Sequence, residues 1–273
     1  QAASATASSK LKFGSAMDYL REGNTCAREG RWREAIIAYR TAALADPACV
    51  QAYNNLGHLL YLHGHHERAV NCFMRAITLA PQLATVRENL LDALVACIRA
   101  ACKRQNFVEA RRWITLGFSS IGACPALIAL RGGILLEERR FQAAMANFAA
   151  VLRDEPTNAV VWGQLGQACL GVHDHKRAKA AFMTAMHHAP EHIDYPMQLG
   201  DMAMDEHEYS AALHWYERAA RIDAAHPTLA RRLERARRGV LVTQPVTHDT
   251  TQTMPTADDG ENIDLQTHSV VAH

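Results

Sequence analysis

The sequence repeats itself with a period of about 34 residues. An alanine placed three positions after a bulky residue recurs six times at this spacing, except that one interval is seven residues longer. A unit of this length cannot bury its apolar side alone, so neighbouring units have to stack into an elongated, repetitive structure. The marker alanines are Ala35, Ala69, Ala110, Ala144, Ala178 and Ala212.

Three further residue types keep the same spacing. A glycine marks the first half of most units, a large apolar or aromatic residue follows the alanine by four positions, and a proline closes most units. Small residues let two helices approach closely, and proline ends a helix because it cannot continue the hydrogen-bond ladder. These markers are Gly23, Gly57, Gly132, Gly166 and Gly200; Tyr39, Phe73, Ile114, Phe148, Phe182 and Tyr216; and Pro47, Pro81, Pro156 and Pro190.

A unit with these residues at these offsets resembles the tetratricopeptide repeat (TPR), which is a pair of antiparallel helices. The resemblance implies an all-α fold: an α-solenoid of about six TPR helix hairpins that forms a right-handed superhelix and ends in a C-terminal capping helix. The expected parts are a flexible N-terminal segment (1–15), six units (16–49, 50–83, 84–124, 125–158, 159–192 and 193–226), a capping helix (227–241) and a disordered, acidic, Thr-rich tail (242–273).

The third unit departs from the pattern. It is seven residues too long, with the excess near VACIRAACKRQNF, and it has Leu91 and Gly122 where the glycine and the closing proline are expected. Seven residues are nearly two helical turns, so an extension keeps the apolar phase and adds about 10 Å at 1.5 Å per residue. We therefore expect a protruding, slightly irregular hairpin between two regular halves.

Composition excludes several classes of function. The formal net charge of +1, from 29 Lys and Arg against 28 Asp and Glu, gives no reason to expect nucleic acid as a partner. The chain contains no apolar run long enough for a membrane span. Seven cysteines without a CxxC pair indicate free thiols and a cytoplasmic location, although Gln1 in place of an initiator Met leaves a removed leader open.

Neither catalysis nor metal binding has a sequence signature. The GxSxG, P-loop, HExxH and dinucleotide-binding motifs are all absent, so we expect no enzyme activity and no cofactor. The tightest histidine group, His63, His65 and His66, falls at a turn between paired helices, and no Cys or carboxylate completes a zinc set there. We interpret the arginines of RRLERARR, within 227–241, as a solubilising cap or a contact for an acidic partner.

The family resemblance implies that the first helix of each unit lines a concave groove that binds a protein or peptide. The first two units place polar and aromatic residues in this groove. The fourth and fifth units form an apolar trough in which the backbone is accessible at its glycines. The sixth unit forms an acidic lip, which favours a basic residue at one end of the ligand. The expected groove residues are Asn24, Asn54, Asn55, His58 and Tyr61; Gly133, Gly163 and Gln167; and Asp194, Asp201 and Asp205.

A series of primary amides recurs at one position of the unit, at Asn55, Asn89, Gln164 and Gln198. An amide both donates and accepts, so such a series can hold the main chain of an extended peptide. It resembles the asparagine ladder in the repeat arm of O-linked N-acetylglucosamine transferases, and helix packing is the alternative explanation.

The carboxylate clamp of chaperone-binding family members needs basic residues beside two asparagines. Asn24 and Asn55 match the asparagines, but Leu20, Thr85 and Asn89 occupy the positions of the bases. Without those cations a terminal carboxylate is poorly compensated, which excludes cochaperone activity of this type.

Three hypotheses for function follow. The first is a non-enzymatic protein-interaction scaffold that binds a peptide segment of a partner protein in the concave groove. The second is the substrate-recruiting arm of a larger enzyme, such as a glycosyltransferase. The third is a self-associating, homo-oligomeric assembly adaptor in secretion or in pilus or polysaccharide export, since one architecture serves many processes.

Overall fold

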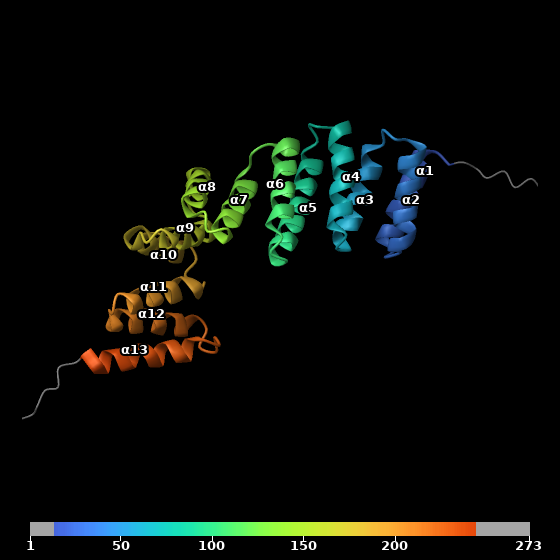
Figure 1. Ribbon diagram of the computed structural model, residues 1–273. Helices are drawn as coiled ribbons and strands as arrows, with labels where there is room; N and C mark the ends of the chain where they lie inside the picture. The colour runs from blue at the N-terminus through green and yellow to red at the C-terminus, as the bar shows by residue number, and fades with distance from the viewer. Residues whose placement is uncertain (1–13, 244–273) are drawn as a thin grey trace, which may run out of the picture.

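The computed structural model describes residues 14–243, and this part of the chain consists of thirteen α-helices joined by short turns, without a β-strand (Figure 1). The first twelve helices pair as six consecutive hairpins. Their first members are α1 (Ala16–Arg28), α3 (Val50–Leu62), α5 (Ala84–Lys103), α7 (Pro125–Glu137), α9 (Ala159–Gly171) and α11 (Asp194–Asp205). Their second members are α2 (Trp32–Ala45), α4 (His66–Leu79), α6 (Phe107–Ile121), α8 (Phe141–Asp154), α10 (His175–His188) and α12 (Tyr209–Ile222). The last helix is α13 (Leu229–Thr243).

The first helix begins at a capping box. The Ser15 hydroxyl accepts a hydrogen bond from the Asp18 backbone N–H at 3.2 Å, and the Asp18 carboxylate accepts one from the Ser15 N–H at 2.9 Å. Both bonds satisfy backbone donors that a helix start otherwise leaves open. Ser15 is therefore fixed, which corrects the expectation of a flexible segment through residue 15, while residues 1–13 lie outside the described part.

Close contact between a glycine and an aromatic ring joins the two helices of a hairpin. A Cβ built on Gly57 would lie 2.7 Å from the Phe73 ring, and one on Gly132 would lie 2.6 Å from the Phe148 ring. Both rings are at most 1% exposed. The glycines are thus required by the closeness of the helices, as the spacing pattern predicted.

The additional residues of the third hairpin lie in its first helix alone. Helix α5 has 20 residues, whereas α3 and α7 have 13 each. Helix α6 has only 15 residues, so it does not run back along the whole of α5. The expectation that the whole hairpin is longer is therefore wrong, because only the first helix of the pair is extended.

The two halves of α5 follow different registers of the repeat. Its N-terminal half continues the spacing of the units before it, and Asn89 there is hydrogen-bonded to Asn54 of α3. Its C-terminal half is in register with the units after it, because Ile98 precedes Ala110 by the same interval by which Gly57 precedes Ala69. Here a buried pair, Ile98 and Ile114, replaces the usual glycine and aromatic ring within one core cluster.

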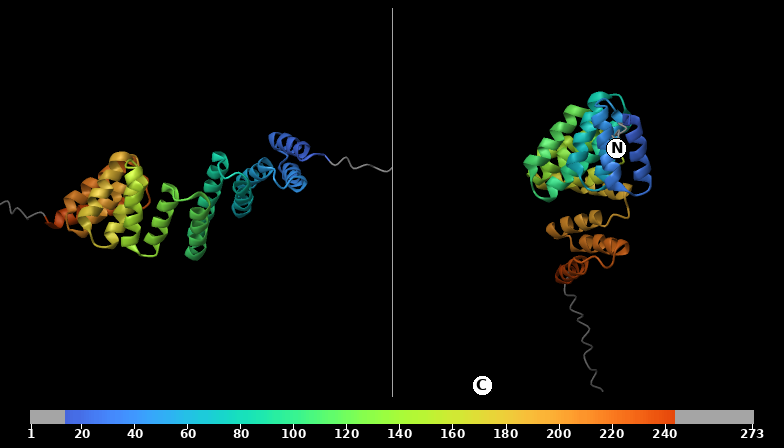
Figure 2. Two further views of the ribbon diagram at one scale, coloured as in Figure 1. Left: turned by 90° about the horizontal axis from the view of Figure 1, so that it is seen from above. Right: turned by 90° about the vertical axis from the view of Figure 1, so that its right-hand side faces the viewer.

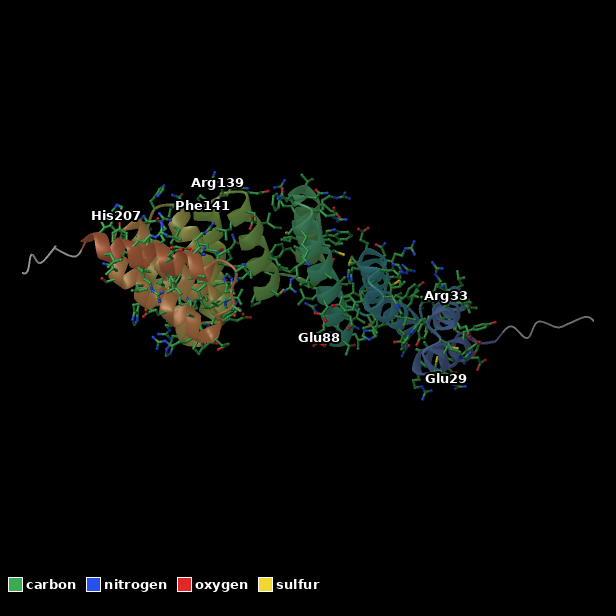
Figure 3. All side chains as sticks on the ribbon, turned by 90° about the horizontal axis from the view of Figure 1, so that it is seen from below. Glu29, Arg33, Glu88, Arg139, Phe141 and His207 are labelled. Atoms are coloured by element: carbon green, nitrogen blue, oxygen red, sulfur yellow. The ribbon has the colours of Figure 1, made fainter. Side chains whose placement is uncertain are left out.

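The hairpins are arranged as a row that turns in its middle. Helices α1 to α6 stand side by side, whereas α11, α12 and α13 are stacked below α9 and α10 instead of continuing the row (Figures 1 and 2). Seen from below, the turn residues Arg139 and His207, from the fourth and sixth hairpins, lie in the half of the molecule that contains α13, and Arg33 of α2 lies at the opposite end (Figure 3).

Helix α13 covers the end of the stack. Leu229 and Ala236 are buried against the sixth hairpin and Leu233 is half-buried, while most of its arginines are exposed. The helix continues to Thr243, so a tail beginning at residue 242 is corrected by two residues, and residues 244–273 are outside the described part. No helix within 14–243 is long and apolar enough to cross a membrane.

Candidate functional site

An apolar hollow of about 560 Å³ lies across three successive first helices, α5, α7 and α9. We call it the central trough. Val160, which lines it, is 60% exposed and adds apolar surface to the hollow. Its lining includes Val95, Arg99, Cys102 and Lys103 of α5; Ala126, Ala129, Leu130, Gly133 and Glu137 of α7; and Asn158, Val160, Val161 and Gln164 at the start of α9.

Small side chains in α7 keep the central trough open. A Cβ built on Gly133 would meet nothing closer than Gln164 Nε2, at 3.7 Å, so this glycine leaves real space above the helix. Helix α9 contains no charged residue at all. A hollow is therefore present at the fourth and fifth units, and Gly133 is among the residues that line it.

Gly163 does not contribute to the trough as expected. It is buried, and a Cβ built on it would lie 2.6 Å from the ring of Tyr195 in α11. The Tyr195 hydroxyl donates to the Ala159 carbonyl at 3.1 Å, which fixes the ring over the glycine. The expectation that Gly163 offers its backbone to a ligand is wrong because an aromatic residue of the next unit covers it. Gln167, one turn further along α9, is exposed.

The first two members of the amide series bond to neighbouring helices. Asn55 Nδ2 donates to Asn24 Oδ1 at 3.0 Å, and the Tyr39 hydroxyl donates to the same oxygen at 2.8 Å. Asn89 Nδ2 donates to Asn54 Oδ1 at 2.9 Å. These bonds join α1 to α3 and α3 to α5, so half of the series serves helix packing.

The last two members of the series are different. Gln164 and Gln198 are half-buried, and their side-chain amides have no hydrogen-bond partner among residues 14–243. Gln164 lines the central trough. An amide with unused donors and acceptors beside an apolar hollow is suited to hydrogen-bond the main chain of a ligand.

The series continues into α13 with Arg232, which the sequence analysis counted only among the arginines of the cap. Arg232 follows Gln198 by one period of the repeat, and its Nη2 lies 3.2 Å from Asp201 Oδ2. Asp201 also accepts a hydrogen bond from the Tyr216 hydroxyl at 2.7 Å, and burial together with this contact raises the pKa of Tyr216. The Asp201 carboxylate thus binds Arg232 of the capping helix and is not free to form an acidic lip. Extending the 34-residue spacing past the sixth unit leads from Gln198 to Arg232, so the sequence did contain a signal for this contact.

The other two aspartates of the expected lip are exposed. Asp194 Oδ2 lies 3.6 Å from His192 Nδ1, and both side chains are largely accessible to solvent. Asp205, at the end of α11, forms no ion pair with any residue in the described part of the chain. Of the three aspartates expected to form the acidic lip, only these two are therefore available to a ligand.

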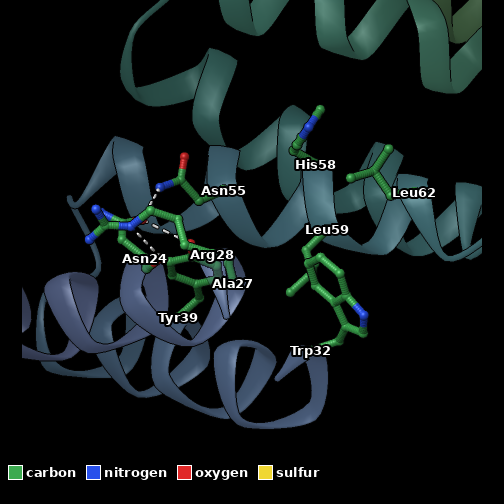
Figure 4. A pocket seen from close by; sticks show the side chains of 9 residues that line it. All are labelled: Asn24, Ala27, Arg28, Trp32, Tyr39, Asn55, His58, Leu59 and Leu62. Carbon is green, nitrogen blue, oxygen red and sulfur yellow. Dashed lines mark hydrogen bonds between the residues drawn. The ribbon is translucent and has the colours of Figure 1, made fainter. Parts of the chain in front are cut away.

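A second hollow of about 660 Å³ lies between α1 and α3, and we call it the N-terminal pocket (Figure 4). Trp32 and Leu62, which are 41% and 60% exposed, give it an apolar end. At its polar end, Asn24 Oδ1 accepts two hydrogen bonds, so the Nδ2 group of Asn24 remains free to donate. Arg28, Asn55 and His58 also line the pocket, whereas Tyr61 is half-buried beside the ring of His66, with centroids 5.3 Å apart.

Four of the seven cysteines are buried and the other three are half-buried. All seven are free thiols. Burial raises the pKa of Cys97 to about 12 and that of Cys72 to about 11, so both stay protonated at neutral pH and are poor nucleophiles. Within residues 14–243, no three His, Cys, Asp or Glu side chains are grouped to hold a metal ion.

The tetratricopeptide repeat pattern matches the sequence at residues 50–83 and again at residues 135–197. The chain is a tetratricopeptide repeat protein. Proteins of this family are generally scaffolds that bind protein partners and have no catalytic role. No curated protein sequence matches the chain.

Three solved structures illustrate the similarity of fold. A chain of the APC/C hetero-tetramer Cut9-Hcn1 has a TM-score of 0.53 at 16% identity, over 81% of this chain but only 42% of that one. PilW, a type IV pilus biogenesis factor, has a TM-score of 0.51 at 12% identity, over 81% and 97% of the two chains. PilF of Pseudomonas aeruginosa has a TM-score of 0.53 at 12% identity, over 82% and 96%. At these identities the likeness concerns the fold alone.

Proposed function

We propose that this protein is a non-enzymatic scaffold that holds an extended segment of a partner protein on its concave side, with the central trough as the main docking place. The observation that carries the proposal is the trough itself, an apolar hollow across three first helices in whose lining Val160 is exposed. Exposed apolar surface of this kind, edged by polar groups, is typical of a binding site.

The residues of the trough suggest how a peptide is held. An aliphatic side chain of the ligand fills the space above Gly133 and Val160, which removes apolar surface from water. The free amides of Gln164 and Gln198 hydrogen-bond the ligand main chain. Because an extended segment loses conformational freedom when it docks, we expect a modest affinity.

Two further features extend the proposed site along the groove. The N-terminal pocket, with the free Nδ2 group of Asn24 and the ring of Trp32, receives another part of the same segment. At the other end, Asp194 and Asp205 favour a basic residue of the ligand. The seven free thiols fit a reducing compartment such as the cytoplasm.

A pair of matched substitutions tests the proposal. Val160→Asp puts a charge into the central trough, whereas Val108→Asp puts the same charge on α6; the two valines are 60% and 63% exposed, so neither change disturbs the core. We expect native partners in a pull-down, identified by mass spectrometry, to be lost with Val160→Asp and kept with Val108→Asp. Loss with Val108→Asp alone moves the site to the second helices and contradicts the proposal.

A further inference from the structure

The extra turns of α5 bring two basic side chains to the central trough. Arg99 and Lys103 lie in the C-terminal half of α5, which is in register with the fourth and fifth units, and both line the hollow. Without the seven additional residues, the third first helix would end before Arg99. The departure from the regular period and the charge of the trough therefore have the same origin.

Both basic side chains are exposed, and neither forms an ion pair with another residue between 14 and 243. They are four residues apart on one helix, where two like charges repel each other. An anion held between them would remove this repulsion. The pair thus adds a favourable electrostatic contribution for a negatively charged ligand group at the edge of an apolar floor.

One carboxylate at the same hollow limits this positive charge. Glu137 ends α7, as Lys103 ends α5, and its charge acts on the adjacent Cys102 thiol. It offsets part of the charge of Lys103. Arg99 lies one turn further back along α5 and is the stronger candidate to meet an acid.

We propose that the central trough selects a peptide segment in which an aliphatic residue is accompanied by an acidic residue, and that Arg99, assisted by Lys103, binds the carboxylate of the acidic residue. The aliphatic side chain lies over Val160 and Gly133, and the carboxylate lies on the α5 side, away from Glu137. A guanidinium binds a carboxylate with two parallel hydrogen bonds, which gives Arg99 geometric as well as electrostatic selectivity. This inference rests on the proposed peptide-binding function of the same trough.

The test begins with phage-displayed random peptides selected on the parent protein. The peptides recovered are synthesised with a fluorescent label, and their dissociation constants are measured by anisotropy. Four variants are compared with the parent: Arg99→Glu, Lys103→Glu, Val160→Asp and the control Arg40→Glu. Arg40 is an exposed base in α2 with no ion-pair partner in the described chain, so its reversal changes the net charge by the same amount as that of Arg99.

We expect the recovered peptides to combine an aliphatic with an acidic residue and to lose about tenfold in affinity with Arg99→Glu, less with Lys103→Glu, and nothing with Arg40→Glu. Replacing the peptide's Asp by Asn should weaken binding to the parent by about fivefold, whereas it should not weaken binding to Arg99→Glu, where it removes a repulsion between two carboxylates. Peptides that need Val160 but carry no acid, and bind Arg99→Glu as tightly as the parent, overturn the inference and leave the proposed function standing. Failure to recover any peptide, or binding that ignores Val160→Asp, overturns both.

Discussion

Two adjacent glycines of α7 should respond to the same substitution with different changes in stability. A Cβ on Gly132 would lie 2.6 Å from Phe148 Cε1 and 2.9 Å from Cδ1, and Phe148 is fully buried, so its ring cannot swing aside. A Cβ on Gly133 would meet only Gln164 Nε2, at an ordinary 3.7 Å. Neither glycine has a positive φ, so backbone strain does not enter the comparison.

The magnitudes follow from two opposing effects. Replacing Gly by Ala inside a helix stabilises it by about 1 kcal/mol, and both variants gain this contribution. Forcing an extra carbon into a packed core costs about 1–3 kcal/mol, and only Gly132→Ala bears this cost. The free energy of unfolding of Gly133→Ala should therefore exceed that of the parent by about 1 kcal/mol, and that of Gly132→Ala should be about 1–3 kcal/mol below that of Gly133→Ala.

Urea unfolding followed by far-UV circular dichroism measures both variants against the parent under identical conditions. The denaturant slope should stay the same, because neither change alters the surface exposed on unfolding. Equal stability of the two variants would refute the argument, since it would mean that the glycine at the helix contact is not required by Phe148.

Three further predictions follow from the described contacts. Asn55→Ala should lower the free energy of unfolding by about 1 kcal/mol because it removes a hydrogen bond between helices. Gln164→Ala should leave the free energy of unfolding unchanged and weaken peptide binding. Thermal unfolding measures the first effect, and fluorescence anisotropy of a bound peptide measures the second. Arg232→Ala should destabilise the cap while Arg235→Ala, in an exposed position, does not, and hydrogen exchange of α13 reports the difference. Burial raises the pKa of Cys97 to about 12 in the folded protein, whereas it is near 9 in the unfolded chain, so the free energy of unfolding should fall as pH rises above about 9. Urea unfolding at a series of pH values, with Cys97→Ala as the control, checks this. The same dependence of the free energy of unfolding on pH in both proteins would contradict it.

The fold was predictable because each unit carries its own markers. The glycine and aromatic spacing predicts close helix pairs, and Gly57 with Phe73 forms such a pair in the structure. The extension of α5 was predictable in length but not in place. A count of residues does not reveal that each half of α5 keeps the repeat register of a different neighbour. The register of each half depends on which neighbouring unit that half contacts.

The candidate site was predictable only in outline. Sequence spacing places residues on the groove side of a helix, but it does not show whether neighbouring side chains cover them or bind them. Gly163 is covered by Tyr195 from the next unit, and Asp201 is neutralised by Arg232 from a helix beyond the last full repeat. The positions that stay available, such as Gln164 beside Gly133, depend on small side chains across the unit boundary.

Photo-crosslinking in a lysate of the native source tests the central claim most directly. A benzoylphenylalanine is placed at position 160 in the central trough or at position 108 on α6, two sites of nearly equal exposure. The account predicts that a partner protein becomes covalently linked from position 160 and not from position 108, and that an excess of the peptide selected on the trough prevents the link. A partner linked from position 108 alone would contradict the claim that the concave trough is the docking site.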